Sequence, residues 1–313
     1  MKYERILRAI ANECWAILPS KLEEIIGVLK CRMTGIDLPP EAAIRREAAR
    51  RQPQQNGAVG VLPLFGAISH RAGAMESSIG TSAEAFGQAF DSLMDNPQVK
   101  SVILDIDSPG GSVSGIQELS DKIRSRRGEK KVVAVANAGA FSAAYWIATA
   151  ASEVVITPSG SVGSVGVLAA HHDKSGFDEK EGIKVTYIHA GEFKTEANPH
   201  EPLEDEARSE IQRHVDRHYN MFVSGLAANR GTTEARVRHT FGGGRIVGAK
   251  DAVSRGMADR VATLEIIIQE LAGRPQRSPM AAQLRRRMDA AKIPTPITSS
   301  TKKTRRVISR KRF

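Results

Sequence analysis

Cysteine is scarce in this chain of 313 residues, occurring only at Cys14 and Cys31. Their spacing matches no metal-binding or redox motif, and so low a number favours a reducing compartment, with a single disulfide as the alternative. Long apolar runs are also missing: no stretch reaches the roughly 18 apolar residues of a membrane helix. Charged residues such as Arg5 and Arg8 interrupt the N-terminal apolar stretch, so it does not resemble a signal peptide. We therefore expect a cytosolic protein without a transmembrane anchor.

Acidic residues are nearly absent from the C-terminal end. Residues 274–313 hold thirteen Lys and Arg and a single acid, Asp289, whereas the rest of the chain is close to neutral. The segment is rich in Pro, Ser and Thr, which predicts a disordered, solvated tail. The alternative is an electrostatic tether to nucleic acid or to an acidic protein partner. Apart from Phe313 the tail has no aromatic residue, so stacking on bases is not expected.

The chain divides into three segments of different character. The sequence of residues 1–57 predicts a helical N-terminal arm that ends in a polar linker. The helices of the arm are expected to break near Pro19 and Pro39. Residues 58–273 alternate short apolar runs with amphipathic stretches, which indicates strands alternating with helices. Residues 274–313 are the basic tail.

The alternation predicts an α/β domain with a mostly parallel sheet and right-handed crossovers. Its strands are expected at 58–64, 101–107, 131–136, 153–157, 164–169 and 184–189. Its helices are expected at about 82–96, 113–127, 142–151 and 203–229. Within the arm, an amphipathic helix is expected over residues 1–18. We see no internal repeat.

A glycine pair follows the strand expected at 101–107, in the sequence DSPGGS (107–112). Glycines at a strand-to-helix turn let the backbone approach a ligand closely, and amide N–H groups there can point at an anion. The segment is neither a P-loop nor a dinucleotide-binding motif. A plain tight turn is the alternative.

Two further segments carry a candidate nucleophile and a candidate base. Ser142 opens a helix of small residues directly after a strand, where negative charge is favoured; helix capping is its alternative role. Lys194 lies in the loop GEFKTEANP (191–199), where a solvated surface lysine is the alternative. A serine hydroxyl needs a base to take its proton. A lysine serves only where burial lowers its pKa from about 10.4 to about 7–8.

Neighbouring titratable groups suggest no second site. His214 and His218 are spaced i, i+4 as in some zinc sites, but the segment is not HExxH and its helix is highly charged, so we expect solvent-facing side chains. Glu192 and Glu196 flank Lys194, and a close carboxylate would raise a lysine pKa, so we expect both to point away. We expect neither a metal nor a cofactor.

Four motifs in this order resemble the S49 peptidases: SPGGS (108–112), a serine on a small-residue helix with YWIA (142–148), GSVGV (163–167) and GEFKTEANP (191–199). The late segment GRIVGAKDAVSRGMADRV (244–261) is similar to the closing element of that family. The family comprises the signal peptide peptidase A proteins and their phage capsid-protease relatives. The resemblance covers about residues 58–263 and implies a ClpP/crotonase-like fold, a repeated β-β-α superhelix with a mostly parallel sheet.

The resemblance also implies roles for five residues. Ser142 matches the family's nucleophile, Lys194 its general base, and Ser164 a serine that hydrogen-bonds the lysine. The backbone N–H groups of Gly111 and Ala143 would form the oxyanion hole. Many members have two glycines after the nucleophile where this chain has two alanines. That change keeps the backbone donor and reduces the space beside the serine, which puts substrate preference in doubt more than activity.

A serine-type endopeptidase with a Ser–Lys dyad is therefore expected. Anchored members of the family act as signal-peptide peptidases, whereas phage members cut scaffold, portal or themselves inside assembling capsids. The missing anchor and the appended arms favour the phage role, in the host cytoplasm or the assembling prohead, with a host cytosolic S49 peptidase as the alternative. A catalytically silent scaffold and a crotonase-like acyl-CoA enzyme are further candidates from different functional classes.

The expected partners follow from that function. They are a protein or peptide substrate, further copies of the chain in a homo-oligomer, and capsid scaffold or portal proteins. The basic tail, residues 274–313, is a candidate for contact with nucleic acid or an acidic protein, and for removal by self-cleavage.

Overall fold

The computed structural model describes residues 13–33, 53–71 and 80–273. The chain divides into two units, Met1–Arg274 and Pro275–Phe313, and all described residues lie in the first. The predicted tail, the N-terminal residues 1–12 and the helix expected after Pro39 lie outside the described residues. Among the residues described, no helix is both long and apolar enough to cross a membrane.

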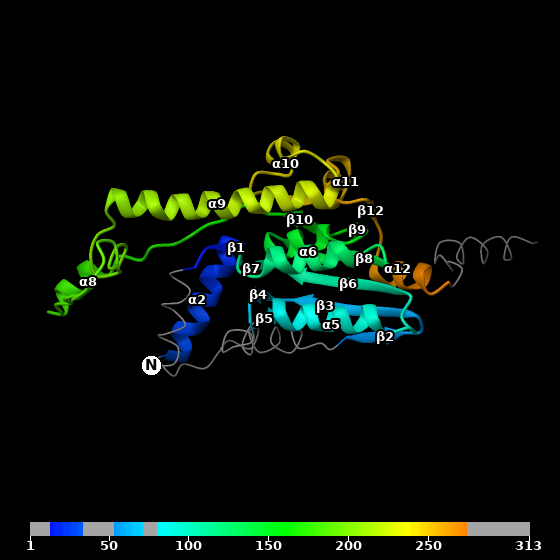
Figure 1. Cartoon of the computed structure of the whole chain (residues 1–313), viewed down its shortest axis with the longest axis horizontal. Coiled ribbons are helices and arrows are strands. Elements are labelled where there is room, and N and C mark those ends of the chain that lie inside the picture. The colour runs from blue at the N-terminus through cyan, green and yellow to red at the C-terminus, as the bar shows by residue number, and fades with distance from the viewer. Residues whose placement is uncertain (1–12, 34–52, 72–79, 274–313) are drawn as a thin grey trace, which may run out of the picture. The chain divides into compact units, whose positions relative to one another are not determined.

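An eight-stranded, mostly parallel sheet forms the centre of the first unit (Figure 1). Three long neighbours run parallel in the order β3 (Val59–Phe65), β6 (Ser101–Ser108) and β8 (Lys131–Phe141). The strands β9 (Glu153–Ile156) and β10 (Ser161–Gly163) also run parallel to β8, and β12 (Arg260–Val261) runs parallel to β9. The edge strands β2 (Gln54–Asn56) and β11 (Ile246–Gly248) are antiparallel to their neighbours. The predicted α/β class with a mostly parallel sheet is confirmed.

A second, four-stranded sheet lies at the carboxyl ends of β3 and β6. Its order is β1 (Trp15–Ile17), β7 (Gly110–Ser112), β4 (Ala67–Ser69) and β5 (Gly80–Ser82). Because β4 follows β3 and β7 follows β6 almost without a break, each long strand continues into this small sheet. Only β1 comes from the N-terminal arm.

Strand side chains alternate between two covered faces of the central sheet. On one face, residues such as Val102 and Leu104 pack against three helices, α5 (Ala83–Asp95), α6 (Ile116–Arg126) and α7 (Ala143–Thr149). On the other face, residues such as Ile103 and Val133 pack with Ile267 of α12 (Leu264–Leu271). Both faces of the strands are buried, which explains their nearly continuous apolar runs.

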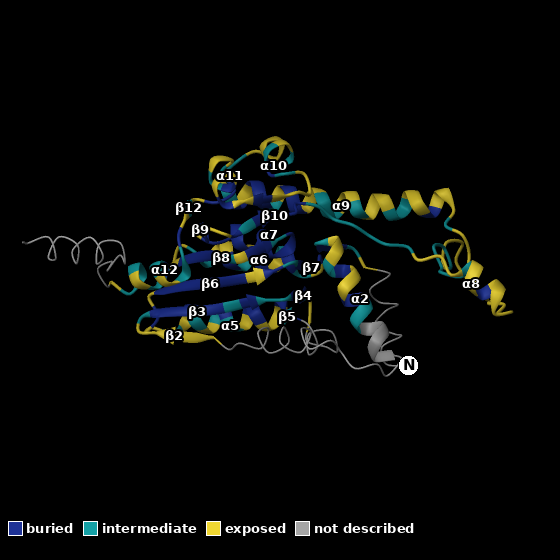
Figure 2. Ribbon diagram, turned by 180° about the vertical axis from the view of Figure 1, so that it is seen from behind, coloured by how far each residue is buried: buried dark blue, intermediate teal, exposed yellow. Residues whose placement is uncertain are grey.

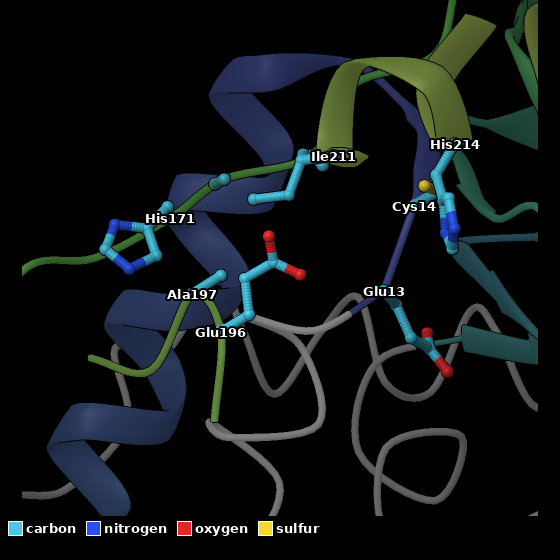
Figure 3. Close-up of a pocket in the computed structure, with 9 residues that line it drawn as sticks. Glu13, Cys14, His171, Glu196, Ala197, Ile211 and His214 are labelled. Atoms are coloured by element: carbon cyan, nitrogen blue, oxygen red, sulfur yellow. The ribbon is translucent and has the colours of Figure 1, made fainter. Parts of the chain in front are cut away.

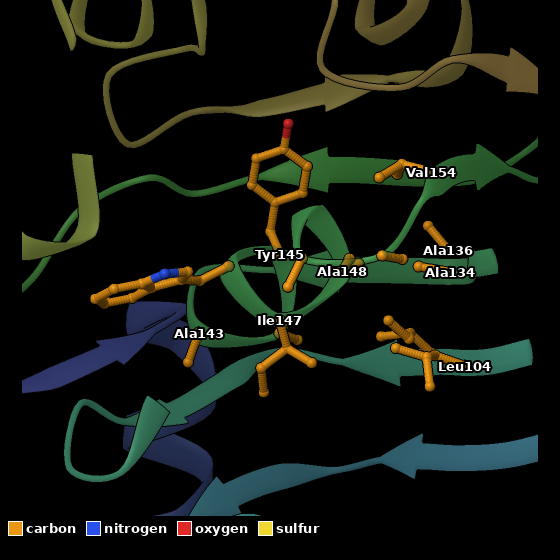
Figure 4. Close-up of a cluster of buried hydrophobic side chains, with 14 of the residues drawn as sticks. Leu104, Ala134, Ala136, Ala143, Tyr145, Ile147, Ala148 and Val154 are labelled. Atoms are coloured by element: carbon orange, nitrogen blue, oxygen red, sulfur yellow. The ribbon is translucent and has the colours of Figure 1, made fainter. Parts of the chain in front are cut away.

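The long helix α9 (Asp205–Arg230) differs between its two halves, as the burial colours of Figure 2 show. Its C-terminal half packs on α7, where the Trp146 indole stacks on Phe222 with ring centroids 4.8 Å apart. Its N-terminal half is largely exposed and leads back to the loop segment that holds α8 (Ser175–Lys180). Two short helices, α10 (Glu234–Thr240) and α11 (Ala249–Ser254), follow it. Figure 4 shows the core around α7, where Tyr145 and Ile147 lie among side chains of the central strands.

Most predicted elements are confirmed, and three are wrong. Residues 15–17, expected within a helix, form strand β1, because the edge of β7 offers a partner that local sequence does not show. Residues 164–169 form no continuous strand, and only Leu168 makes an isolated bridge. Residues 184–189 have strand-like composition but no strand beside them, so they remain irregular.

Candidate active site

Ser142 sits in a strained turn between β8 and α7. Its backbone dihedrals are φ +53° and ψ −117°, in a region that residues with a side chain rarely adopt. The turn is held by the Ser142 N–H, which donates to Gly163 O at 2.8 Å, and by the Trp146 N–H, which donates to Ser142 O at 3.0 Å. The Ser142 side chain makes no capping hydrogen bond to α7. Helix capping therefore does not explain this serine.

The Ser142 hydroxyl is fully buried and donates to Gly166 O at 3.3 Å. Gly166 belongs to the irregular stretch after β10, which includes Ser164. Ser164 also has a positive φ, +55°, is buried, and donates its N–H to Arg245 O at 2.9 Å. Its hydroxyl makes no hydrogen bond to any residue described. Ser142 thus contacts the stretch that holds Ser164, and of the two hydroxyls only that of Ser142 is hydrogen-bonded among the described residues.

The glycine turn lies against the same serine. Gly110 has φ +98°, and a Cβ there would clash with Ala16 O and lie 3.0 Å from both Phe141 O and Ser142 Cβ. A Cβ on Gly111 would clash with the backbone of Ile68. Only glycine permits both approaches. The glycine turn therefore brings its backbone close to Ser142 at Gly110, whereas Gly111 packs against Ile68.

The two predicted oxyanion donors are both close to this serine. Gly111 lies in β7 next to Gly110, and Ala143 directly follows Ser142 as the first residue of α7. The first N–H groups of a helix have no intrahelical acceptor, so the Ala143 amide is free of the helical ladder. Both residues are buried. The candidate site therefore brings a buried serine hydroxyl together with the two backbone positions that the family resemblance implies as oxyanion donors.

Lys194 lies apart from this arrangement. Its side chain is exposed, whereas that of Ser142 is fully buried, and it makes no ion pair or side-chain hydrogen bond with a described residue. It belongs to the irregular segment 171–204, which Figure 1 shows extending away from the central sheet around α8. The structure does not join Lys194 to Ser142, and the dyad stays a prediction.

The segment that carries Lys194 is unusually apolar for an exposed one. Several of its large hydrophobic side chains are in solvent, including Ile188 at 99%, Phe177 at 61% and Phe193 at 56%. Further exposed members are Ile183, Val185 and Tyr187. Exposed apolar side chains gathered in this way are typical of surfaces that contact another molecule.

The other titratable candidates are engaged elsewhere. His214 is exposed on α9 and pairs with Glu210 at 2.9 Å, and burial lowers the pKa of His218, aided by Arg217 and His214. His171 lies 3.3 Å from Asn198 O through its Nε2. Within the described ranges, no group of three or more His, Cys, Asp or Glu side chains could hold a metal ion.

A cavity of about 150 Å³ lies between the N-terminal strand, the stretch after β10 and α9 (Figure 3). Its lining includes Glu13, Cys14, His171, Glu196 and Ile211. Glu196, which the sequence predicted to point away from the lysine, faces this cavity in Figure 3. The cavity begins just before β1, at the edge of the four-stranded sheet.

Sequence reasoning missed β1 as part of this site. The residues Trp15, Ala16 and Ile17 carry no catalytic motif, and their apolar character fits a helix equally well. The only local signal was Pro19, which begins α2 (Pro19–Met33) and so limits any preceding helix.

A family model matches the part of the chain that holds Ser142, Ser164 and Lys194, but not the glycine turn at 108–112. Residues 124–276 match the model described as peptidase family S49. The predicted resemblance to that family is thereby confirmed over a stretch that includes Ser142, Ser164 and Lys194.

Curated relatives include proteins of phages and of cells. The chain is 32% identical over 204 residues to the head-tail preconnector protein GP5 of Enterobacteria phage P21, covering 65% of this chain and 40% of the relative. It is 31% identical over 214 residues to capsid assembly protease C of Escherichia phage lambda, covering 68% of this chain and 48% of the relative. A putative protease of Methanocaldococcus jannaschii is 31% identical over 183 residues, 58% of each chain. The chain thus spans less than half the length of the two phage relatives.

Among solved structures, a ClpP1 variant from Listeria monocytogenes overlaps at 14% identity with a TM-score of 0.40, covering 66% of this chain and 94% of that one. A score this low carries no argument, and the fold described above rests on the strands and helices themselves.

Proposed function

We propose that this chain is a serine endopeptidase in which Ser142 is the nucleophile and Lys194 the general base. The observation that carries the proposal is the buried Ser142 hydroxyl in a strained turn with no capping role, packed against Gly110. Strain of this kind persists only where the surroundings enforce it, and it clusters at active sites. The match to a peptidase family over residues 124–276, which include Ser142 and Lys194, supports it.

We further propose that Lys194 reaches Ser142 from a neighbouring copy of the chain. Within one chain the lysine is exposed and the serine is buried. An exposed lysine stays protonated at neutral pH, whereas a lysine transferred into an apolar contact loses its proton more readily. The exposed apolar residues around Lys194, such as Ile188 and Phe193, supply that contact when copies assemble. Assembly would therefore position the base and activate it in one step.

The chemistry follows from these positions. The neutral amine of Lys194 takes the Ser142 proton as Oγ bonds to the substrate carbonyl carbon, and the oxygen becomes an oxyanion. The N–H groups of Gly111 and Ala143 donate to that oxyanion, each typically contributing about 10²–10³ in rate. The C–N bond then breaks and the lysine returns its proton to the leaving amine. Water then hydrolyses the acyl ester, with Lys194 again as the base. Throughout, the Ser164 hydroxyl hydrogen-bonds the amine of Lys194.

We propose capsid maturation as the biological role, with scaffold or portal proteins, or the chain itself, as substrate. Two of the relatives are named as a phage capsid assembly protease and a phage head-tail preconnector protein. A cellular relative is named only as a putative protease. If the chain were instead a host peptidase with the same active site, it would cut general test substrates but not phage assembly proteins.

Mixed oligomers test the dyad and its origin together. Ser142→Ala and Lys194→Ala proteins are assayed on casein separately and after co-expression. Each is expected to be inactive, and random mixing should restore about a quarter of wild-type activity, because one neighbour pair in four combines an intact serine with an intact lysine. Activity of Ser142→Ala equal to wild type would overturn the nucleophile. A mixture that stays inactive, beside an active wild type, would place both residues in one chain.

Co-expression with candidate assembly proteins tests the role. Wild-type protein should fragment a scaffold or portal protein, read by mass spectrometry, and the Ser142→Ala protein should leave it whole. Casein cleavage with every assembly protein intact would contradict the capsid role and favour a general peptidase.

A further inference from the structure

The N-terminal strand β1 is held along both of its edges. On one edge, Trp15–Ile17 pairs antiparallel with β7, the strand of the glycine turn. On the other edge, the Trp15 N–H donates to Leu168 O at 2.8 Å and the Leu168 N–H donates to Trp15 O at 2.9 Å. Main-chain hydrogen bonds to a strand edge are how an extended peptide is bound in β-augmentation. The strand β7 and the stretch around Leu168 therefore form the two walls of a groove that holds β1. Leu168 lies two residues beyond Gly166, the acceptor of the Ser142 hydroxyl, so both walls adjoin the nucleophile.

The register brings the Ala16 backbone to one of the predicted oxyanion donors. Ala16 lies opposite Gly111 in the antiparallel pair. Hydrogen bonds at both ends of the pair join the Val113 N–H to Cys14 O at 3.3 Å and the Leu18 N–H to Pro109 O at 3.0 Å. Because hydrogen-bonded pairs recur at every second residue of such a ladder, Ala16 and Gly111 form the hydrogen-bonded pair between them. The Gly111 N–H therefore faces the Ala16 carbonyl.

The same carbonyl is close to the nucleophile. A Cβ built on Gly110 would clash with Ala16 O, and the same point lies 3.0 Å from Ser142 Cβ. Ala16 O and Ser142 Cβ therefore crowd one side of Gly110. A carbonyl that meets both a serine and an oxyanion donor is placed as the carbonyl of a bond to be cut.

The side chains of β1 point to two sides: one side packs against α2 and the other enters the main core. Trp15 and Ile17 point to one side, where they pack with Leu22, Ile25 and Ile26 of α2. Ala16 points to the other side and is fully buried in the main core cluster, which also contains Ala143. The groove therefore gives the central residue room for a small side chain only. Beyond Cys14 it opens into the cavity of Figure 3, which has space for residues that precede the cut bond.

We propose that the Ala16–Ile17 peptide bond is the chain's own first substrate, and that self-cleavage there frees the groove for other substrates. This inference rests on the proposed peptidase function and adds a cleavage site and a small-residue preference on its acyl side. While β1 is in place, Ser142 is fully buried. Arrival of the lysine would start the cut.

The step balances with water as the only co-reactant. Ser142 Oγ bonds to the Ala16 carbonyl carbon and gives its proton to the lysine amine. The bond to Ile17 N breaks, and that nitrogen takes the proton and leaves as a new amino terminus. Water then splits the ester, returning the serine hydroxyl and releasing residues 1–16 with a carboxylate on Ala16.

The first test reads the N-terminus of the assembled full-length protein. Wild type should lose residues 1–16 and begin at Ile17 by intact mass and N-terminal sequencing, whereas Ser142→Ala should keep them. Wild type that digests casein yet keeps residues 1–16 would overturn the self-cleavage and leave the peptidase proposal standing. Wild type that digests neither casein nor itself would overturn both.

A second test separates sequence preference from folding. A synthetic peptide of residues 11–22, ANECWAILPSKL, should be cut by wild type between alanine and isoleucine. In the full chain, Ala16→Phe should slow the cut by at least about tenfold because the small site rejects the ring, while Ala16→Ser should keep it. Equal cutting of Ala16→Phe and Ala16→Ser, or peptide cleavage at another bond, would contradict the proposed register.

Discussion

Ser142 and Lys194 lie in regions with opposite surroundings. Ser142 is fully buried, in a turn held by β10 and α7, whereas Lys194 is exposed on an irregular segment whose large apolar side chains are in solvent. The serine's position is decided within the chain by glycine contacts and backbone hydrogen bonds. By contrast, no ion pair or side-chain hydrogen bond within the described residues holds the Lys194 side chain in place. In the proposed peptidase, this division would let the chain fold with Ser142 in place before a neighbouring copy supplies Lys194.

The division also explains where β1 fits. Without β1, the edge of β7 beside Ser142 would be unpaired. An unpaired strand edge can pair with another chain. The arm supplies a strand, Trp15–Ile17, that satisfies this edge and is anchored by α2. The buried half of the candidate site, around Ser142, is thus complete within one chain, and the proposal leaves only its exposed half, around Lys194, to a neighbouring copy.

The largest effect is expected from breaking the buried half at Gly111. Gly111→Ala places a Cβ against the Ile68 backbone and displaces a predicted oxyanion donor. Casein hydrolysis should fall by about 10²–10³. The matched control is Gly128→Ala, where a Cβ meets nothing within 4 Å. Equal activity of the two variants would show that β7 does not form the oxyanion hole.

Breaking the exposed half should act on assembly instead of folding. Ile188 is 99% exposed, so Ile188→Glu should leave the thermal midpoint of the isolated chain unchanged while weakening subunit association by at least about tenfold, as a charge placed in an apolar contact does. Sedimentation measures the association. Val261→Glu, at an exposed apolar residue of β12, is the control. Unchanged association in both variants would remove segment 171–204 from the subunit contact.

A smaller effect is expected where α9 packs on α7. A Cβ on Gly225 would clash with the buried indole of Trp146, which is stacked on Phe222 and has no room to shift. Gly225→Ala should therefore destabilise by about 1–3 kcal/mol despite the better helix propensity of alanine. Gly27→Ala in α2, where a Cβ meets nothing within 4 Å, should be stabilising or neutral in the same urea titration.

The smallest effect concerns acid and the ion pair between Arg230 of α9 and Asp259, whose carboxylate also accepts from the Val154 N–H of β9. Burial alone raises the pKa of Asp259, but hydrogen bonds from Arg230 and the Val154 N–H outweigh it and hold the pKa below its usual value. A depressed folded-state pKa contributes stability above the unfolded value of about 3.9 that is lost as pH falls through the folded one. Wild type should therefore lose more stability than Asp259→Asn between about pH 5 and 3. Asp121→Asn, at an exposed aspartate of α6, should follow wild type.

Local patterns were enough to predict the buried half. Strand–helix alternation placed β3, β6, β8 and β9, since apolar runs bounded by turns have few other structures. The glycines of SPGGS were recognisable because only glycine allows such close approach. Their contact with Ser142, 31 positions along the chain from Gly111, needed either the fold or a family resemblance.

The strand β1 shows where such patterns fail. Trp15–Ile17 is three residues long, and its conformation comes from β7 and Leu168 at distant places in the sequence. Residues 184–189 fail in the opposite direction: they have strand composition and no partner. In both cases strand pairing decides the outcome, and pairing is not a local property.

The sequence by itself determined the α/β class and the order of the motifs, because periodicity and residue chemistry are local. The candidate nucleophile, base and oxyanion donors came from the resemblance of those motifs to a known family. Only the tertiary structure decided that Ser142 is buried in a strained, uncapped turn, that Lys194 is exposed on an apolar segment, and that Ala16 lies across the glycine turn. Burial and strand register depend on segments far apart in the chain, and those meet only when it folds.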